Sequence, residues 1–173
     1  MLLSASLLVT NAFAADLTMT NRYDNPAYGF IIQFPHQINI CTTPAPGPNH
    51  GFVALLRSDS CRDGVFEQKP HLELFVRYDV ITMAKSTAEL ADELCENKPA
   101  RRSKIRSAGL AVYQCQTMLV GELTLWRYFF LHPQRDGAGQ IYSLDLYSDQ
   151  AHAAQDRLLQ KKILQQLKFI SRQ

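Results

Sequence analysis

The chain predicts a single α+β domain, in which a mostly antiparallel β-sheet is covered by helices as an α/β/α sandwich. Residues 71–80 alternate apolar and polar side chains, as a half-buried antiparallel strand does. Residues 151–168 instead repeat apolar side chains at helical spacing. Hydrophobic residues make up 46% of the 173 residues, which is enough for one buried core and excludes a disordered chain.

The first half of the chain predicts three strands joined by irregular loops. β-Branched and aromatic residues fill 28–34, and Pro35 ends this first strand. Three prolines and two glycines make 42–51 a loop, and a second strand follows at 51–57. We expect the second strand to pair with the first. The third strand is the alternating segment 71–80.

The second half predicts a helix, four strands and a terminal helix. Ser86 and Glu89 form an S-x-x-E capping box, so we expect a helix from Ser86 to Glu96. Four strands follow, at 102–107, 110–118, 122–132 and 141–148. The terminal helix, about 151–168, carries an apolar stripe of Leu159, Ile163, Leu167 and Ile170.

The four cysteines form an even set with three possible pairings. We favour Cys41–Cys61 with Cys95–Cys115, because each bridge would then close a loop of about twenty residues, worth roughly 3 kcal/mol in the chain-entropy description. Free or metal-bound thiols are the alternative. No C-x-x-C spacing occurs, which argues against a zinc or redox site.

The N-terminus predicts export. An apolar run from Leu2 leads to Ala12-Phe13-Ala14, the A-x-A pattern of a signal peptidase site, so we expect a signal peptide at 1–14 and a periplasmic or secreted protein. An apolar N-terminus or a buried first strand is the alternative. Residue 15 is alanine rather than cysteine, so we expect no lipid anchor, and no segment has the ~18 apolar residues of a transmembrane helix. An extended segment, 15–27, would precede a single domain at 28–173.

Two short motifs bracket this domain. Residues 28–35 are YGFIIQFP, and residues 163–170 are ILQQLKFI. They resemble the G-[FY]-x-[IL]-x-[FY]-P opening strand and the ILxSLKF terminal helix of the PsbP-like/Mog-type α/β/α sandwich superfamily. The resemblance spans most of 28–170 and concerns core and turn positions; the cysteine pairs and the 42–51 loop have no counterpart in it. It implies an exported bacterial member among binding, adaptor and assembly proteins that lack catalytic residues.

Composition and motifs argue against several other classes of function. The net charge of +2 gives no reason to expect a nucleic-acid partner. The five histidines lack H-x-H or H-x-x-x-H spacing and no G-x-S-x-G is present, so we expect no metal, no cofactor and no catalytic residue. Asp59, Asp63 and Glu67 resemble part of a calcium loop, but Cys61 replaces one ligand and Pro70 the bidentate glutamate, so we expect a solvated turn.

Two regions are candidates for binding a protein partner. The first is a cationic strand, which would meet an acidic protein or anionic envelope polymers through Arg101, Arg102, Lys104 and Arg106. Since 102, 104 and 106 would share one face, the same charges equally suit a solvated edge strand. The second is the proline-stiffened loop 43–51, whose recognition residues would be His50 together with Arg62, Asp63 and Glu67 beyond the Cys41–Cys61 bridge.

The function we predict is a non-catalytic periplasmic binding protein, most concretely an inhibitor or immunity protein for an exported toxin or enzyme. The alternative is a cell-envelope assembly or maintenance factor that binds several clients. A hydrolase site assembled in space from His50, Ser60 or His132 is a third possibility. The sequence leaves the choice between monomer and homodimer open.

Overall fold

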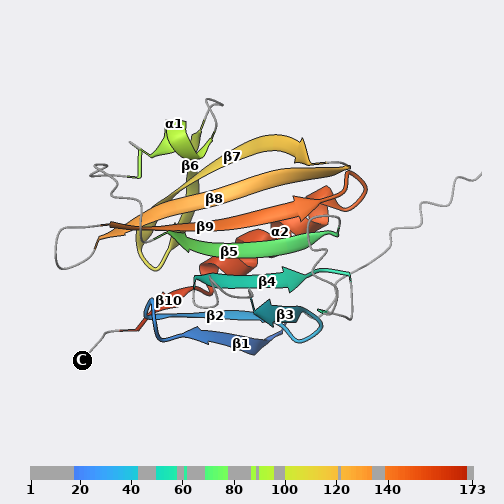
Figure 1. The fold of residues 1–173 in the computed structure, drawn as a ribbon, viewed down its shortest axis with the longest axis horizontal. Coiled ribbons are helices and arrows are strands. Elements are labelled where there is room, and N and C mark those ends of the chain that lie inside the picture. The colour runs from blue at the N-terminus through green and yellow to red at the C-terminus, as the bar shows by residue number, and fades with distance from the viewer. Residues whose placement is uncertain are drawn as a thin grey trace, which may run out of the picture.

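Two antiparallel sheets make up most of the chain in the computed structural model, which describes residues 18–42, 50–57, 61, 69–77, 87–88, 90–95, 100–120, 122–133 and 139–170. The larger sheet has seven strands in the order β3-β4-β5-β9-β8-β7-β6 (Figure 1). Their bounds are Asn39–Thr42 (β3), Gly51–Leu55 (β4), His71–Arg77 (β5), Arg101–Ser107 (β6), Leu110–Val120 (β7), Leu123–Pro133 (β8) and Gly139–Ser148 (β9). The predicted signal peptide lies outside the described residues.

The smaller sheet has three strands in the order β1-β2-β10. They are Met19–Asn25 (β1), Phe30–Pro35 (β2) and Lys168–Phe169 (β10). β1 lies in the segment expected to be extended ahead of the domain, and it pairs with β2 along its length. The two helices are α1, Ala91–Leu94, and α2, Ala153–Gln165.

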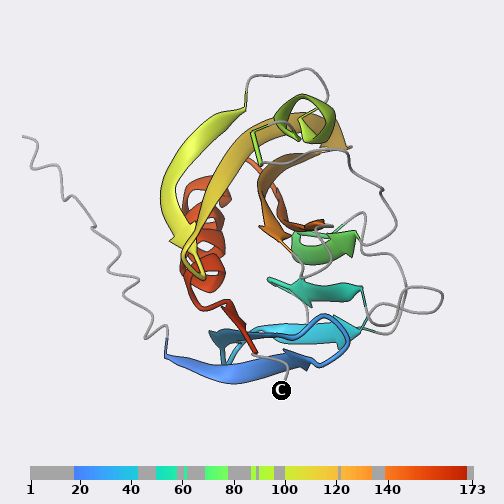
Figure 2. The same cartoon turned by 90° about the vertical axis from the view of Figure 1, so that its left-hand side faces the viewer.

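A helix packs on each face of the seven-stranded sheet. The alternation of β8 sends Tyr128 and Phe130 into the main core with Ile163 of α2, whereas Phe129 joins Leu94 of α1 in a second core. Figure 2 shows the sheet curving around α2, with α1 on its outer side and the small sheet closing one end. The predicted α+β sandwich is therefore confirmed.

The predicted pairing of the first two strands is wrong. β4 pairs with β3 on one side and β5 on the other, while β2 belongs to the smaller sheet. The cause is the segment after Pro35, where a turn closed by the Ile38 N–H on the Pro35 carbonyl (3.1 Å) leads into β3, an additional strand. β3 occupies the edge of β4 that the first strand was expected to fill.

Both predicted helices are shorter in the structure. Of the expected 86–96 helix, residues 91–94 form the single helical turn α1, whereas residues 87–88, 90 and 95 are turns, and the capping-box residues lie outside the described residues. α2 ends at Gln165, so Ile170 is not part of its apolar stripe and is 43% exposed. The reason is β10, which pairs with β2 and places the Ile170 N–H on the Gly29 carbonyl at 2.7 Å.

The strands from β6 to β9 follow the prediction closely. Ala108 and Gly109 both have positive φ angles, 46° and 80°, as the two-residue turn between β6 and β7 requires.

Within the described residues no helix is long and apolar enough to span a membrane.

Candidate functional site

The cationic segment predicted as a partner-binding strand is β6, which forms one edge of the large sheet. Arg101, Arg102 and Arg106 are all exposed, and β7 is the neighbour with which β6 pairs in the described residues. Arg102 and Arg106 pair with Tyr113 and Ala111, which lie two residues apart on β7 and so on one face of the sheet, and the register shifts between the two arginines. Exposed cations on an unpaired edge protect it against strand addition and also attract acidic partners.

The second predicted region is not brought together with β6. His50 stands just before β4, and β5, β9, β8 and β7 separate β4 from β6. Its Nδ1 lies 3.0 Å from the Tyr28 hydroxyl and 3.0 Å from the Val76 carbonyl oxygen, contacts that hold the ring in the fold. The other members, Arg62, Asp63 and Glu67, and the loop 43–49, lie outside the described residues, as do Asp59 and Ser60 of the other predicted sites. The side chain of Lys104 is likewise not described.

The cysteines form the two predicted pairs. Cys41 and Cys61 have Cα atoms 5.7 Å apart, and Cys95 and Cys115 have theirs 6.0 Å apart. Cys95 is fully buried, so its bridge joins the end of α1 to β7 within the second core.

The described residues hold no group of three or more potential metal ligands of the His, Cys, Asp and Glu types.

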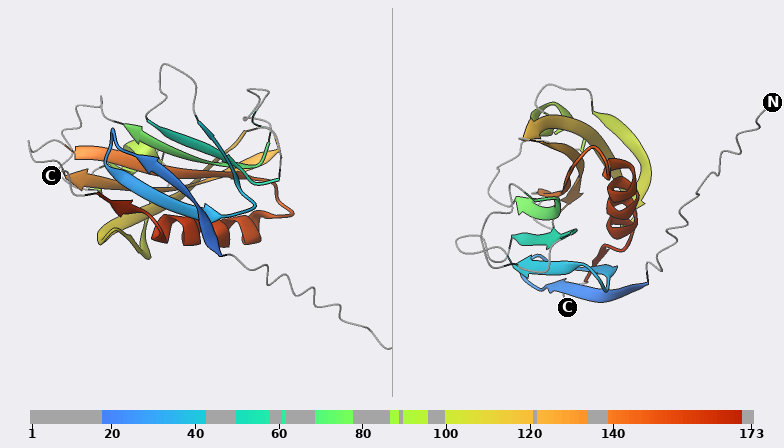
Figure 3. Two further views of the ribbon diagram at one scale, coloured as in Figure 1. Left: turned by 90° about the horizontal axis from the view of Figure 1, so that it is seen from below. Right: turned by 90° about the vertical axis from the view of Figure 1, so that its right-hand side faces the viewer.

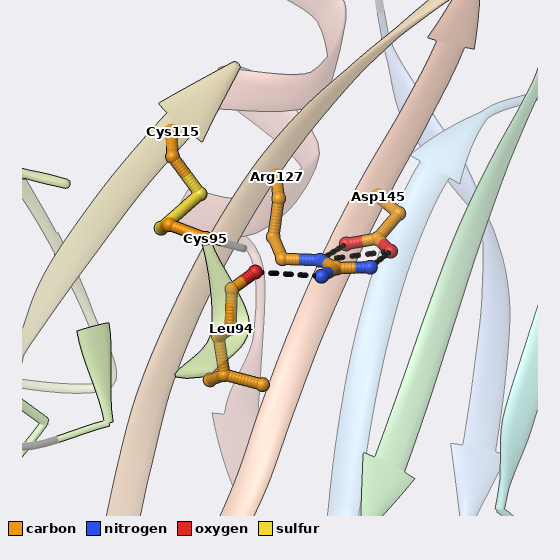
Figure 4. Close-up of a disulfide and its surroundings, with 5 residues drawn as sticks. All are labelled: Leu94, Cys95, Cys115, Arg127 and Asp145. Atoms are coloured by element: carbon orange, nitrogen blue, oxygen red, sulfur yellow. Dashed lines mark hydrogen bonds and ion pairs between the residues drawn. A yellow bond between two sulfur atoms is a disulfide. The ribbon is translucent and has the colours of Figure 1, made fainter. Parts of the chain in front are cut away.

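A buried ion pair stands beside the Cys95–Cys115 bridge (Figure 4). Arg127 and Asp145 face each other across β8 and β9, with Nη2–Oδ2 and Nε–Oδ1 distances of 2.6 and 2.9 Å. A third donor of the guanidinium, Nη1, reaches the Leu94 carbonyl oxygen at 2.8 Å. The pair therefore supports α1, a single turn that has too few internal hydrogen bonds to be stable alone.

On the opposite face of the same strands lies a pocket of about 320 Å³. It opens between α2 and the β6–β8 part of the sheet, which lie side by side in Figure 3. The side chains that face α2 come from Gln114, Gln116, Trp126 and Tyr128, because these residues alternate with Cys115 and Arg127 on the other face. Arg101 closes the β6 side, and Arg157 and Gln160 close the α2 side.

α2 is fixed over this pocket by polar contacts at several points along its length. Arg57 donates to both carboxylate oxygens of Asp156 at 2.8 Å, in the first turn of the helix. The Ser107 hydroxyl of β6 donates to the Leu164 carbonyl at 3.0 Å. These contacts hold the helix at a set distance from the sheet, so the pocket is part of the folded structure.

The pocket is electropositive and partly aromatic. The Arg157 guanidinium carbon lies 5.7 Å from the Trp126 ring centroid, a cation–π contact. Burial raises the pKa of the Tyr128 phenol, an effect that the charge of Arg157 partly opposes. Tyr128 is therefore a neutral hydrogen-bond donor across the physiological pH range.

Gln160 is the distinctive polar group of the pocket. Its side chain is fully buried, and Nε2 donates to the Trp126 and Leu144 carbonyls at 2.9 and 2.8 Å. With both amide hydrogens used in this way, Oε1 is left buried without a hydrogen-bond partner. An acceptor in that state costs about 1–3 kcal/mol unless another group donates to it.

No pattern in the sequence predicted this pocket. Its residues come from four separate elements, so no motif joins them. One signal was present: Gln160 falls at helical spacing between Asp156 and Ile163 on the buried face of the terminal helix, where a polar amide is unusual.

No known protein family matches the sequence, and no curated protein sequence is similar to it. Solved structures do share its fold. CyanoP, the cyanobacterial PsbP of Synechocystis sp. PCC 6803, is 12% identical with a TM-score of 0.53, over 93% of this chain and 98% of its own. LpqN of Mycobacterium tuberculosis, a protein involved in cell envelope biogenesis, is 13% identical with a TM-score of 0.54, over 82% of this chain and 83% of its own. The Ran-binding protein Mog1p of Saccharomyces cerevisiae is 11% identical, with a TM-score of 0.49 over 88% of this chain and 97% of its own.

The first two of these similarities show that the chain has the PsbP/Mog-like fold. They agree with the opening-strand and terminal motifs that resemble this superfamily. At such low identities the similarity concerns the fold alone.

Proposed function

We propose that this protein is an exported, non-catalytic binding protein of the cell envelope, and that the cationic edge β6 docks an acidic partner protein. The most concrete form of the proposal is an inhibitor or immunity protein for an exported toxin or enzyme. The mature chain would begin at residue 15, after the signal peptide, and would work in the periplasm or outside the cell.

Two observations support export. Disulfides persist in oxidising compartments and are rare in the cytosol, and this chain pairs all four of its cysteines. The apolar N-terminus with its A-x-A pattern supplies a route to such a compartment.

The observation that carries the binding role is the exposure of Arg101, Arg102 and Arg106 along one sheet edge. Guanidinium groups form bidentate hydrogen bonds with carboxylates, and a row of them raises the association rate with an acidic surface. Because such contacts lie at the rim, we expect the affinity to fall as the salt concentration rises.

One observation favours a second candidate. LpqN, which shares the fold, is involved in cell envelope biogenesis. The alternative proposal is therefore an envelope assembly or maintenance factor that binds several clients weakly through the same edge.

The test is affinity capture of the tagged mature chain from its native host, with the bound proteins identified by mass spectrometry. The informative variant is Arg102→Gln/Arg106→Gln, since both side chains are exposed and neither lines the pocket. Lys161→Gln/Lys162→Gln removes the same charge from the exposed face of α2 and is the matched control.

One stoichiometric exported protein, lost with the β6 variant and kept with the control, would establish the inhibitor role. Several envelope proteins that are lost together would favour the assembly factor. A partner that binds both variants equally would exclude β6 as the interface.

A further inference from the structure

The pocket between α2 and strands β6–β8 holds three features that call for a ligand. Its lining includes two arginines without a carboxylate partner in the lining, Arg101 and Arg157, the Trp126 ring over which Arg157 lies, and Gln160, whose buried Oε1 has no hydrogen-bond partner. Its volume of about 320 Å³ suits a small molecule rather than a protein segment. It lies beside β6 and shares Arg101 with the proposed protein interface, whereas Arg102 and Arg106 of that interface do not line it.

The charge of the lining determines the charge of the ligand. Arg101 and Arg157 stand on opposite sides, from β6 and α2, and none of the residues that line the pocket is acidic. Planar guanidinium groups match the two oxygens of a carboxylate. An organic carboxylate is therefore the anion that the lining favours.

The buried amide adds a second requirement. Gln160 Oε1 is held in place because Nε2 is committed to two backbone carbonyls of β8 and β9. A ligand N–H or O–H pointing at this oxygen would remove the cost of leaving it unpaired. The requirement is directional, and a simple inorganic anion without a proton does not meet it.

The remaining lining determines the body of the ligand. The lining includes the aromatic residues Trp126 and Tyr128 and the polar residues Gln114 and Gln116. A ligand with one flat apolar side and several polar atoms fits such a lining. N-Acylated amino acids or short peptides and sugar acids both have this chemistry.

We infer that the pocket is a binding site for a small organic carboxylate that also carries an N–H or O–H donor. Arg101 and Arg157 hold the carboxylate, Trp126 stacks on the apolar face, and Gln160 Oε1 accepts from the donor. The inference does not depend on the partner-docking role of β6.

Trp126 is the single tryptophan of the chain, so its fluorescence reports on the pocket directly. We would titrate the intact mature protein at neutral pH with N-acetyl-phenylalanine, glucuronic acid, their methyl esters and sulfate, which carries no proton, following fluorescence and binding heat. We expect one of the two acids to bind with a dissociation constant of about 1 mM or tighter, and its ester at least tenfold more weakly. Which acid binds identifies the source, a peptide terminus or a sugar acid.

The matched variants are Arg157→Gln and Lys161→Gln, both on the exposed side of α2, with Arg157 lining the pocket and Lys161 outside it. Arg157→Gln should weaken acid binding about tenfold by calorimetry, and Lys161→Gln should not change it. Gln160→Met removes the acceptor and should also weaken acid binding, and thermal unfolding verifies that this variant folds. If Gln160→Met does not fold, the comparison of Arg157→Gln with Lys161→Gln still tests the inference.

Esters that bind as well as the acids, sulfate that binds better than either acid, or no saturable response to any acid would overturn the inference. If Arg102→Gln/Arg106→Gln abolishes partner capture but leaves acid binding unchanged, the inferred carboxylate site stands. This outcome separates the pocket proposal from the partner-docking proposal.

Discussion

The Arg127–Asp145 pair yields the sharpest prediction on stability. The side chains are only 14% and 7% exposed, and they face each other at 2.6 Å between β8 and β9. Replacing Asp145 by asparagine keeps the shape but leaves the guanidinium buried without its counter-charge. Removing one partner of a buried pair costs about 3–5 kcal/mol, of the same order as the attraction of two charges about 4 Å apart at an effective dielectric constant near 20.

A double replacement separates charge from packing. Arg127→Met/Asp145→Leu removes both charges and fills a similar volume, which is often neutral for stability. Here the Leu94 carbonyl also loses the donor that lies at 2.8 Å, so we expect a cost of about 1–2 kcal/mol, less than that of Asp145→Asn alone. Asp24→Asn is the exposed control, because the Arg22–Asp24 side chains are 54% and 50% exposed, and it should cost less than about 0.5 kcal/mol.

The measurement is urea unfolding of the oxidised protein at neutral pH, followed by Trp126 fluorescence. An Asp145→Asn variant that loses less than about 1 kcal/mol of unfolding free energy would show that the pair is solvated. A double variant less stable than the single one would refute the argument that the unpaired charge is the source of the cost.

Three further predictions concern a glycine, a histidine and a disulfide bridge. Gly51→Ala should lower the unfolding free energy by about 3 kcal/mol or prevent folding, because a Cβ at this position would overlap the Leu74 carbonyl oxygen of β5. Gly109→Ala is the control: the added Cβ has free space there, so the variant should lose only about 1 kcal/mol from the positive φ angle. Equal urea midpoints for the two variants would contradict this prediction. Burial lowers the pKa of His132, so the folded state binds fewer protons than the unfolded state and stability falls as the pH drops below about 6.5. His132→Phe should flatten that slope in urea midpoints taken between about pH 7.5 and 5, and an unchanged slope would be the contrary result. Removing the Cys95–Cys115 bridge by alanine replacement should cost about 3 kcal/mol, given the sequence separation of 20, and a midpoint equal to that of the oxidised wild type would contradict it.

The sequence alone determined the features that depend on local periodicity. Alternation identified β5 and placed Leu72, Leu74 and Val76 on its buried side, because a strand sends successive side chains to opposite faces. The predicted strand bounds, 102–107 and 110–118, placed the reversal between β6 and β7 at residues 108 and 109. The disulfide pairing was also predicted, because each bridge closes a loop of about twenty residues, and the structure places Cys95 against Cys115 in the second core.

The tertiary structure decided what depends on register and on contacts far apart in the chain. Whether Arg127 meets Asp145, and whether β4 pairs with β2 or β3, follows from sheet order, which no short motif specifies. Ile170 continues the helical period in the sequence but leaves the helix because β10 gains hydrogen bonds from β2. The pocket is the clearest case: residues 101, 126, 157 and 160 meet only because packing places α2 against the β6–β8 part of the sheet.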